Sequence, residues 1–170
     1  MPYNFVSCQI LPMFDTNHTI EILTNVIGCM YCGIIVAKKE GNFLVWNNKA
    51  SEVLGKKEAD IPIEKWSEFY GCYNSETGKL LDYTDLPLYR AMQGEEVENY
   101  VLLIKNEIVK ETWINCNAKP LLQHGEIVGG VVVFQDISRE KEIERQLKIL
   151  SKKMEILSEK QSTMIDSWKK

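Results

Sequence analysis

The sequence lacks most of the groups on which enzymes rely. It holds only two histidines, His18 and His124, so few side chains are suited to general-base chemistry near neutral pH. It contains no Gly-rich phosphate-binding loop and no ordered set of serine, histidine and aspartate. The adjacent Glu95 and Glu96 open a predicted strand, where neighbouring side chains face opposite ways, so they do not converge as an acid pair. We therefore expect no enzymatic activity.

Long hydrophobic runs are also missing. No segment reaches the roughly 20 apolar residues that cross a bilayer, and residues 1–15 lack a basic start followed by a continuous apolar run. These absences predict a cytoplasmic protein without membrane insertion. In that compartment the cysteines are expected to stay reduced. There are five of them: Cys8, Cys29, Cys32, Cys72 and Cys116.

Charge is distributed unevenly along the chain. The formal net charge is −4. Residues 139–170 hold nine Lys or Arg against six Asp or Glu, a net +3, so residues 1–138 carry −7. Because phosphate binding needs a basic face, the acidic body predicts that nucleic acid is not a partner.

The apolar pattern predicts an α+β fold with one five-stranded antiparallel sheet and short helices on one face. Residues 1–16 have no clear period and are predicted to form an arm, 17–138 the domain, and 139–170 a separate helix. The expected strands are 31–38, 43–46, 97–105, 112–122 and 126–137. The expected helices are 17–28, 49–54, 63–70 and 86–93, with Asp85 capping the last of these, while 72–83 is expected to be a polar loop.

Three segments in this order resemble the PAS domain family, of the kind found in bacterial sensor histidine kinases. Residues 41–55, GNFLVWNNKASEVLG, are similar to the family's first hairpin and following helix. Residues 85–95, DLPLYRAMQGE, resemble a helix common in PAS domains of bacterial sensors. Residues 129–138, GGVVVFQDIS, resemble the last strand with its Asp-Ile-Thr/Ser junction. The resemblance covers residues 17–140 and implies a sheet cupped over a small cavity that senses a ligand, cofactor or partner.

The inward face of the sheet is expected to be almost wholly apolar. Side chains alternate along a strand, so Ile114, Cys116 and Ala118 share one face of their strand and Trp113 lies on the other. The resemblance implies that the first face points into the cavity, together with Ile35, Leu102, Ile104, Val132 and Phe134. Such a face is compatible with a ligand cavity and equally with a filled core that binds nothing.

Large cofactors are not expected. Flavin-binding relatives use amide side chains on these strands, whereas the matching positions here are Ile104, Ile114 and Phe134. Haem is not expected because His18 falls at a helix start and His124 at a hairpin tip. The identity of any cofactor therefore stays open.

Two residues separate Cys29 from Cys32, and this pair could hold a metal or an iron–sulfur cluster, or form a redox pair. A complete metal site would also need Cys72 and Cys116. The alternative interpretation is two small hydrophobic residues at the start of the first strand.

The last 32 residues predict a long helix with a heptad seam. No Gly or Pro interrupts it after Ser138, which is positioned to cap it. The seam consists of Ile143, Leu147, Leu150, Met154, Leu157, Gln161, Met164 and Trp168. Because a single helix cannot bury such a seam, a homodimer is expected, with Gln161 at one polar position. Folding of the helix back onto its own domain is the alternative, and Ile149 and Ile156 outside the seam favour it.

The resemblance implies that a change in the cavity is relayed to this helix. Asp136 and Ser138 are expected to couple the last strand to the helix, whose paired copies would then shift between two packings. The expected receiver is an effector of the kinase or cyclase type in a bacterial signal-transduction system. Two classes remain open: a sensor of a small ligand, redox state or partner, and an apo module for dimerisation and protein interaction.

Overall fold

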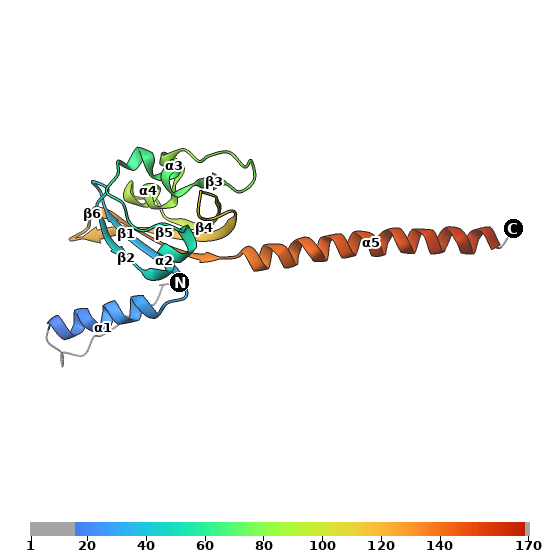
Figure 1. Ribbon diagram of the computed structural model, residues 1–170, viewed down its shortest axis with the longest axis horizontal. Helices are drawn as coiled ribbons and strands as arrows, with labels where there is room; N and C mark the ends of the chain where they lie inside the picture. Colours follow the sequence, from blue (N-terminus) through green and yellow to red (C-terminus); the bar gives the residue numbers. More distant parts are fainter. Residues whose placement is uncertain (1–15, 169–170) are drawn as a thin grey trace.

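A single antiparallel sheet forms the body of the protein (Figure 1). The structure is a computed structural model that describes residues 16–168, and the side chains of 18–158, 160 and 161. The predicted arm at 1–16 therefore lies almost wholly outside the described residues. The strand order is β2-β1-β6-β5-β4-β3. The strands are β1 (Gly33–Lys38), β2 (Phe43–Trp46), β3 (Cys72–Asn74), β4 (Val97–Ile104), β5 (Thr112–Gln123) and β6 (Glu126–Asp136).

The sheet has six strands, so the predicted count of five is wrong, and the loop expected at residues 72–83 is confined to residues 75–82. The additional strand is β3, which pairs its residues 72–74 with residues 102–104 of β4. Three residues are too few to show the alternation by which strands are found in a sequence. β3 forms because it satisfies the backbone groups of an open β4 edge and because its Cys72 side chain is buried in the core.

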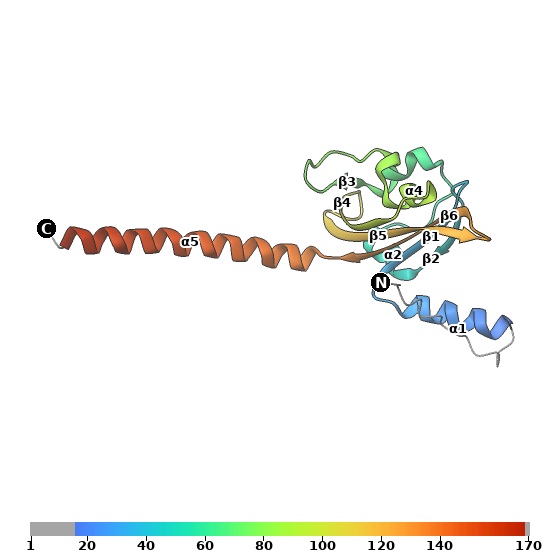
Figure 2. The same ribbon diagram turned by 180° about the vertical axis from the view of Figure 1, so that it is seen from behind.

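Short helices cover one face of the sheet, while the first and last helices lie apart from them. In Figures 1 and 2, α3 (Trp66–Tyr70) and α4 (Pro87–Met92) lie on one side of the sheet and α1 (Thr16–Cys29) on the other. The remaining helical elements are α2 (Asn48–Leu54), α5 (Ser138–Trp168) and the 3₁₀ turns η1 (Ile63–Lys65) and η2 (Tyr83–Asp85). None of the helices within residues 16–168 is long and apolar enough to cross a membrane.

The start of α4 differs from the prediction in its cap. Asp85 does not cap this helix, because it belongs to the preceding turn, η2. Leu86 precedes α4 and offers no side-chain cap, and Pro87 at the first position has no N–H to satisfy. Asp82 instead caps η2, where its Oδ1 accepts a hydrogen bond from the Thr84 backbone N–H at 2.9 Å.

Alternation along β5 sorts its side chains as the pattern predicts. Ile114, Cys116 and Ala118 are 1–2% exposed, whereas Trp113 is partly exposed. The core therefore lies between the inward face of the sheet and the short helices.

Candidate functional site

An apolar cavity of about 70 Å³ lies within this core. Its walls come from the inward faces of β1, β2, β3, β4, β5 and β6, and from α2, α3 and the start of α4. Among the described residues, no charged side chain lines it. The lining residues are Ile35, Phe43, Trp46, Leu54, Trp66, Tyr70, Cys72, Leu86, Pro87, Leu88, Leu102, Ile104, Ile114, Cys116, Val132 and Phe134.

Seven of the eight side chains expected at the cavity line it. They are Ile35, Leu102, Ile104, Ile114, Cys116, Val132 and Phe134. Ala118 is buried at 1% exposure but lies outside the lining. The difference arises because β5 extends past the cavity, and Ala118 pairs with Val97 at the beginning of β4.

An aromatic wall, made of Phe43, Trp46, Trp66 and Tyr70, was not anticipated from the sequence. The Phe43 and Trp66 rings are stacked with centroids 5.0 Å apart, and the Trp46 and Tyr70 centroids are 5.3 Å apart. The aromatic residues of β2 and α3 are visible in the sequence, but each segment is too short for a period to assign its inner face. The tertiary packing of α3 against β2 brings them to one cavity.

Two of the three side-chain polar atoms in the cavity wall form hydrogen bonds with residues behind the wall, and the third has no partner among the described residues. Trp46 Nε1 donates to Ser51 Oγ at 2.8 Å, and the Tyr70 hydroxyl donates to the Lys57 carbonyl at 3.3 Å. Burial raises the pKa of Tyr70 to about 12, so its hydroxyl stays protonated. Within the described part of the chain, buried Trp66 Nε1 has no hydrogen-bond partner.

The end of β6 is tied to the neighbouring strand and to α5 at one junction. Ser138 Oγ accepts a hydrogen bond from the Trp113 N–H of β5 at 2.9 Å, and the Ile137 N–H donates to the Trp113 carbonyl at 2.8 Å. Asp136 Oδ1 accepts from the Ser138 N–H at 2.8 Å. The first residue of α5 is thereby fixed to the sheet through both Asp136 and Trp113.

Family comparison decides what kind of domain this is. The family model for the PAS domain matches residues 32–139, well over half of the chain. The chain belongs to the PAS domain family. PAS domains are typically sensory and signalling modules and are generally not catalytic. No curated protein matches the chain.

The chain is also similar to several solved structures. An RNA-binding light-oxygen-voltage receptor superposes with a TM-score of 0.57 at 17% identity, covering 89% of this chain and 42% of that one. The phage VqmA–DPO complex gives a TM-score of 0.49 at 17% identity, covering 79% and 60%. The PAS domain of Bordetella pertussis BvgS gives 0.44 at 19% identity, covering 79% and 98%. This PAS protein thus spans less than two thirds of the length of each of the first two chains.

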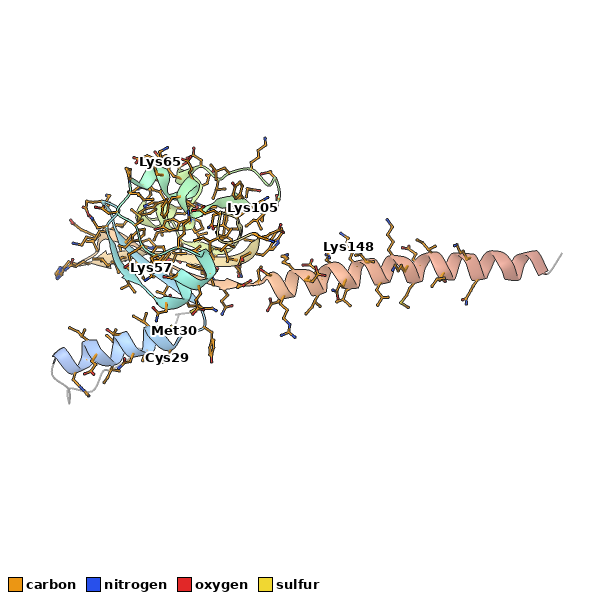
Figure 3. The ribbon with its side chains drawn as sticks, viewed as in Figure 1. Cys29, Met30, Lys57, Lys65, Lys105 and Lys148 are labelled. Carbon is orange, nitrogen blue, oxygen red and sulfur yellow. The ribbon has the colours of Figure 1, made fainter. Side chains whose placement is uncertain are left out.

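Cys8 lies outside the described residues, and the four described cysteines of this PAS domain fall into two separate settings. Cys72 and Cys116 are buried in the cavity wall, and burial raises the pKa of the Cys72 thiol to about 12 and also raises that of Cys116. Cys29 is exposed and Cys32 half-buried. Figure 3 shows Cys29 at the end of α1, outside the packed core. Over the residues described, no three His, Cys, Asp or Glu side chains lie together as metal ligands. The arrangement does not assemble the four-cysteine site considered above.

The predicted seam of α5 is exposed along the described part of the helix. Figure 1 shows α5 extending away from the PAS domain, and Lys148 projects from it in Figure 3. The apolar seam side chains are 48–64% exposed, and Gln161 is exposed as well. These apolar members are Ile143, Leu147, Leu150, Met154 and Leu157. The side chains of Met164 and Trp168 lie outside those that the structure describes.

Asn47 joins α1, β1 and α2 at a second junction. Its buried Oδ1 accepts from the Ile34 and Ala50 backbone N–H groups, both at 2.9 Å, and so caps α2. Its Nδ2 donates to the Ile27 carbonyl at 3.2 Å and to the Cys32 carbonyl at 2.9 Å. Asparagine is a favoured residue at the start of a helix, but the bonds from Asn47 to Ile27, Cys32 and Ile34 are visible only in the folded protein.

Proposed function

We propose that this chain is a sensory PAS module that dimerises through α5 and relays a change at the cavity to an effector of the kinase or cyclase type. In this proposal a small ligand, redox state or partner alters the packing around the cavity. The signal passes along β6, through Asp136 and Ser138, into α5. The chain itself carries out no chemistry in this scheme.

The observation that carries the proposal is the form of α5. This 31-residue helix begins at a residue hydrogen-bonded to the sheet, and it leaves the domain with five apolar seam side chains about half exposed. Leaving such side chains in water forfeits roughly 1.5–3 kcal/mol for each one that a partner could bury. A second copy of the same helix supplies the matching seam.

Ser138 supports the route of the relay. Its backbone lies at the first position of α5, while its Oγ accepts from Trp113 in the strand beside β6. A displacement of β5 or β6 therefore acts directly on the orientation of the helix. Cys116 and Phe134 link the same two strands to the cavity, since they are register partners and both line it.

The second candidate is an apo module for dimerisation and protein interaction. The observation that favours it is the size of the cavity, about 70 Å³, against roughly 300–1,000 Å³ for sites that take drug-sized ligands. In this version the core is nearly filled, and the signal arrives through binding of a partner protein.

The dimer is tested by sedimentation velocity over a range of concentrations. Leu150→Asp combined with Leu157→Asp places two charges in the seam and is expected to give a monomer. The control is Lys148→Asp with Lys152→Asp, which also adds two carboxylates but at positions outside the seam, and it is expected to remain dimeric. A seam variant that sediments like the wild type would overturn the proposed dimer.

The relay is tested by amide hydrogen exchange in the first turns of α5. Replacing both junction side chains, Asp136→Ala with Ser138→Ala, should speed exchange at residues 139–145 at least tenfold while leaving β1 unchanged. Equal protection in the variant and the wild type would show that these two side chains do not couple the strand to the helix.

A further inference from the structure

The surface that the cavity offers to a ligand consists of carbon and sulfur alone. Among the described residues that line the cavity, only Trp46, Trp66 and Tyr70 carry a side-chain nitrogen or oxygen. The Trp46 indole N–H donates to Ser51 Oγ, behind the cavity wall. The Tyr70 hydroxyl donates to the Lys57 carbonyl, also behind the wall. The indole Nε1 of Trp66 is itself buried, although it has no partner among the described residues. The cavity therefore presents nothing that would bind a charged or strongly polar molecule.

The two sulfur atoms in the wall are also uncharged. Burial raises the pKa of both the Cys72 and Cys116 thiols, so neither is a thiolate at neutral pH. A protonated cysteine behaves as a small, polarizable hydrophobic residue. Water is a poor occupant of such a space, because a buried water needs two to four polar partners.

We propose that the cavity takes a small nonpolar molecule, such as a dissolved gas or a short hydrocarbon, and excludes polar metabolites. The cavity volume limits the size of the ligand. An apolar cavity of about 150 Å³ excludes water and binds benzene or xenon. The volume here, about 70 Å³, is roughly half of that. The occupant therefore has roughly three or four non-hydrogen atoms. This inference rests on the proposed sensory function, because it names the class of ligand to which the module responds.

The location of the cavity connects such a molecule to the proposed relay. Cys116 of β5 and Phe134 of β6 form a register pair in its wall, two residues before Asp136. Even a small occupant contacts both strands that meet at Ser138. Because close-packed cores transmit small changes in volume, occupation is expected to shift this pair of strands.

The experiment compares two molecules of the same shape, isobutene and acetone, by methyl NMR titration of the full chain, with xenon as an apolar probe. Isobutene and xenon are expected to shift the methyl signals of Ile35, Leu102 and Val132. Acetone is expected to bind at least about tenfold more weakly, because its carbonyl would be buried without a donor. Acetone binding as tightly as isobutene would overturn the proposal. Loss of that acetone binding in Trp66→Phe would then assign it to the indole N–H.

Two variants fill the cavity to different extents. Val132→Ile adds one methylene, and Cys116→Leu adds more bulk; each is expected to weaken isobutene binding at least fivefold. The control is Cys29→Leu at the exposed cysteine, which should bind like the wild type. Urea unfolding identifies any variant that fails to fold, and Val132→Ile is the milder of the two. Unchanged binding in folded Val132→Ile would place the ligand elsewhere and refute the assignment.

Failure of this inference is separable from failure of the proposed function. Sedimentation of the same samples reports the α5 dimer whether or not a ligand binds. If isobutene and xenon shift no cavity methyl signal while the dimer persists, the ligand class is wrong and the apo form of the module stands.

Discussion

Replacing Asn47 should remove the contacts that hold α1, β1 and α2 together. The side chain is 6% exposed and makes four hydrogen bonds, two as acceptor and two as donor. In Asn47→Ala, α2 loses its N-cap, and the buried Ile34 N–H loses its only side-chain partner. The carbonyls of Ile27 and Cys32 lose a donor too, but both bonds are only partly buried, so water replaces much of it.

The expected loss of stability follows from these two main contributions. Loss of an N-cap costs about 1 kcal/mol. A buried N–H left unpaired costs about 1–3 kcal/mol. Asn47→Ala is therefore expected to lower the free energy of unfolding by about 2–4 kcal/mol.

Urea unfolding followed by circular dichroism measures this difference. The matched control is Asn48→Ala, because Asn48 is the adjacent residue, is exposed and lies in the first turn of α2. It should change the free energy of unfolding by less than about 0.5 kcal/mol. Asn47→Asp retains the accepting oxygen but loses both N–H donors, so it separates the cap and the bond from Ile34 from the bonds to the Ile27 and Cys32 carbonyls. Equal stability of Asn47→Ala and Asn48→Ala would refute this reasoning.

Two further predictions concern the core. Gly33→Ala would place a Cβ 2.3 Å from the Phe134 ring and is expected to destabilise the fold by about 1–3 kcal/mol in urea. The control is Gly28→Ala, because an added Cβ there meets no atom within 4 Å, and its free energy of unfolding should stay within about 0.5 kcal/mol of the wild-type value. Equal effects of the two substitutions would contradict the tight packing of Gly33 against Phe134. Burial raises the pKa of Cys72 to about 12 and also raises that of Cys116. Above about pH 8.5 the unfolded chain loses these thiol protons, whereas the folded protein keeps them. Stability should therefore be complete below that pH and fall as pH rises toward 12, by up to about 1.4 kcal/mol per pH unit for each thiol. Unfolding in urea at pH 8, 9 and 10 should show a shallower fall for Cys116→Ala, and an unchanged slope would show that the thiol does not contribute.

Much of the fold follows from local patterns in the sequence. Alternation along residues 112–122 gives a long strand and sorts Ile114 and Cys116 to its inner face, because the side-chain period of a strand is two. The heptad spacing gives α5, because no Gly or Pro interrupts a period that matches a helix. Short elements were missed or misplaced. β3 has only three residues, and the cap expected from Asp85 is replaced by a 3₁₀ turn capped by Asp82.

Only the part of the cavity wall formed by the long strands was predictable from the sequence. The cavity residues on the long strands were found because alternation assigns them a face. The aromatic wall was not, because Trp66 and Tyr70 lie in a helix of five residues that has no resolvable period. The sequence likewise does not show whether an apolar face is filled or hollow, since volume depends on how side chains from several elements pack together.

The sequence by itself determined the PAS fold, the acidic body, the junction residues Asp136 and Ser138, and the long helix, because each depends on residue type and spacing along the chain. Only the tertiary structure decided the volume of the cavity, the partners of its polar atoms and the four hydrogen bonds of Asn47. These depend on contacts between residues far apart in sequence, such as Ile27 and Asn47, which are 20 positions apart. Local periodicity contains no information about such contacts, because they are fixed only when the sheet closes over its helices.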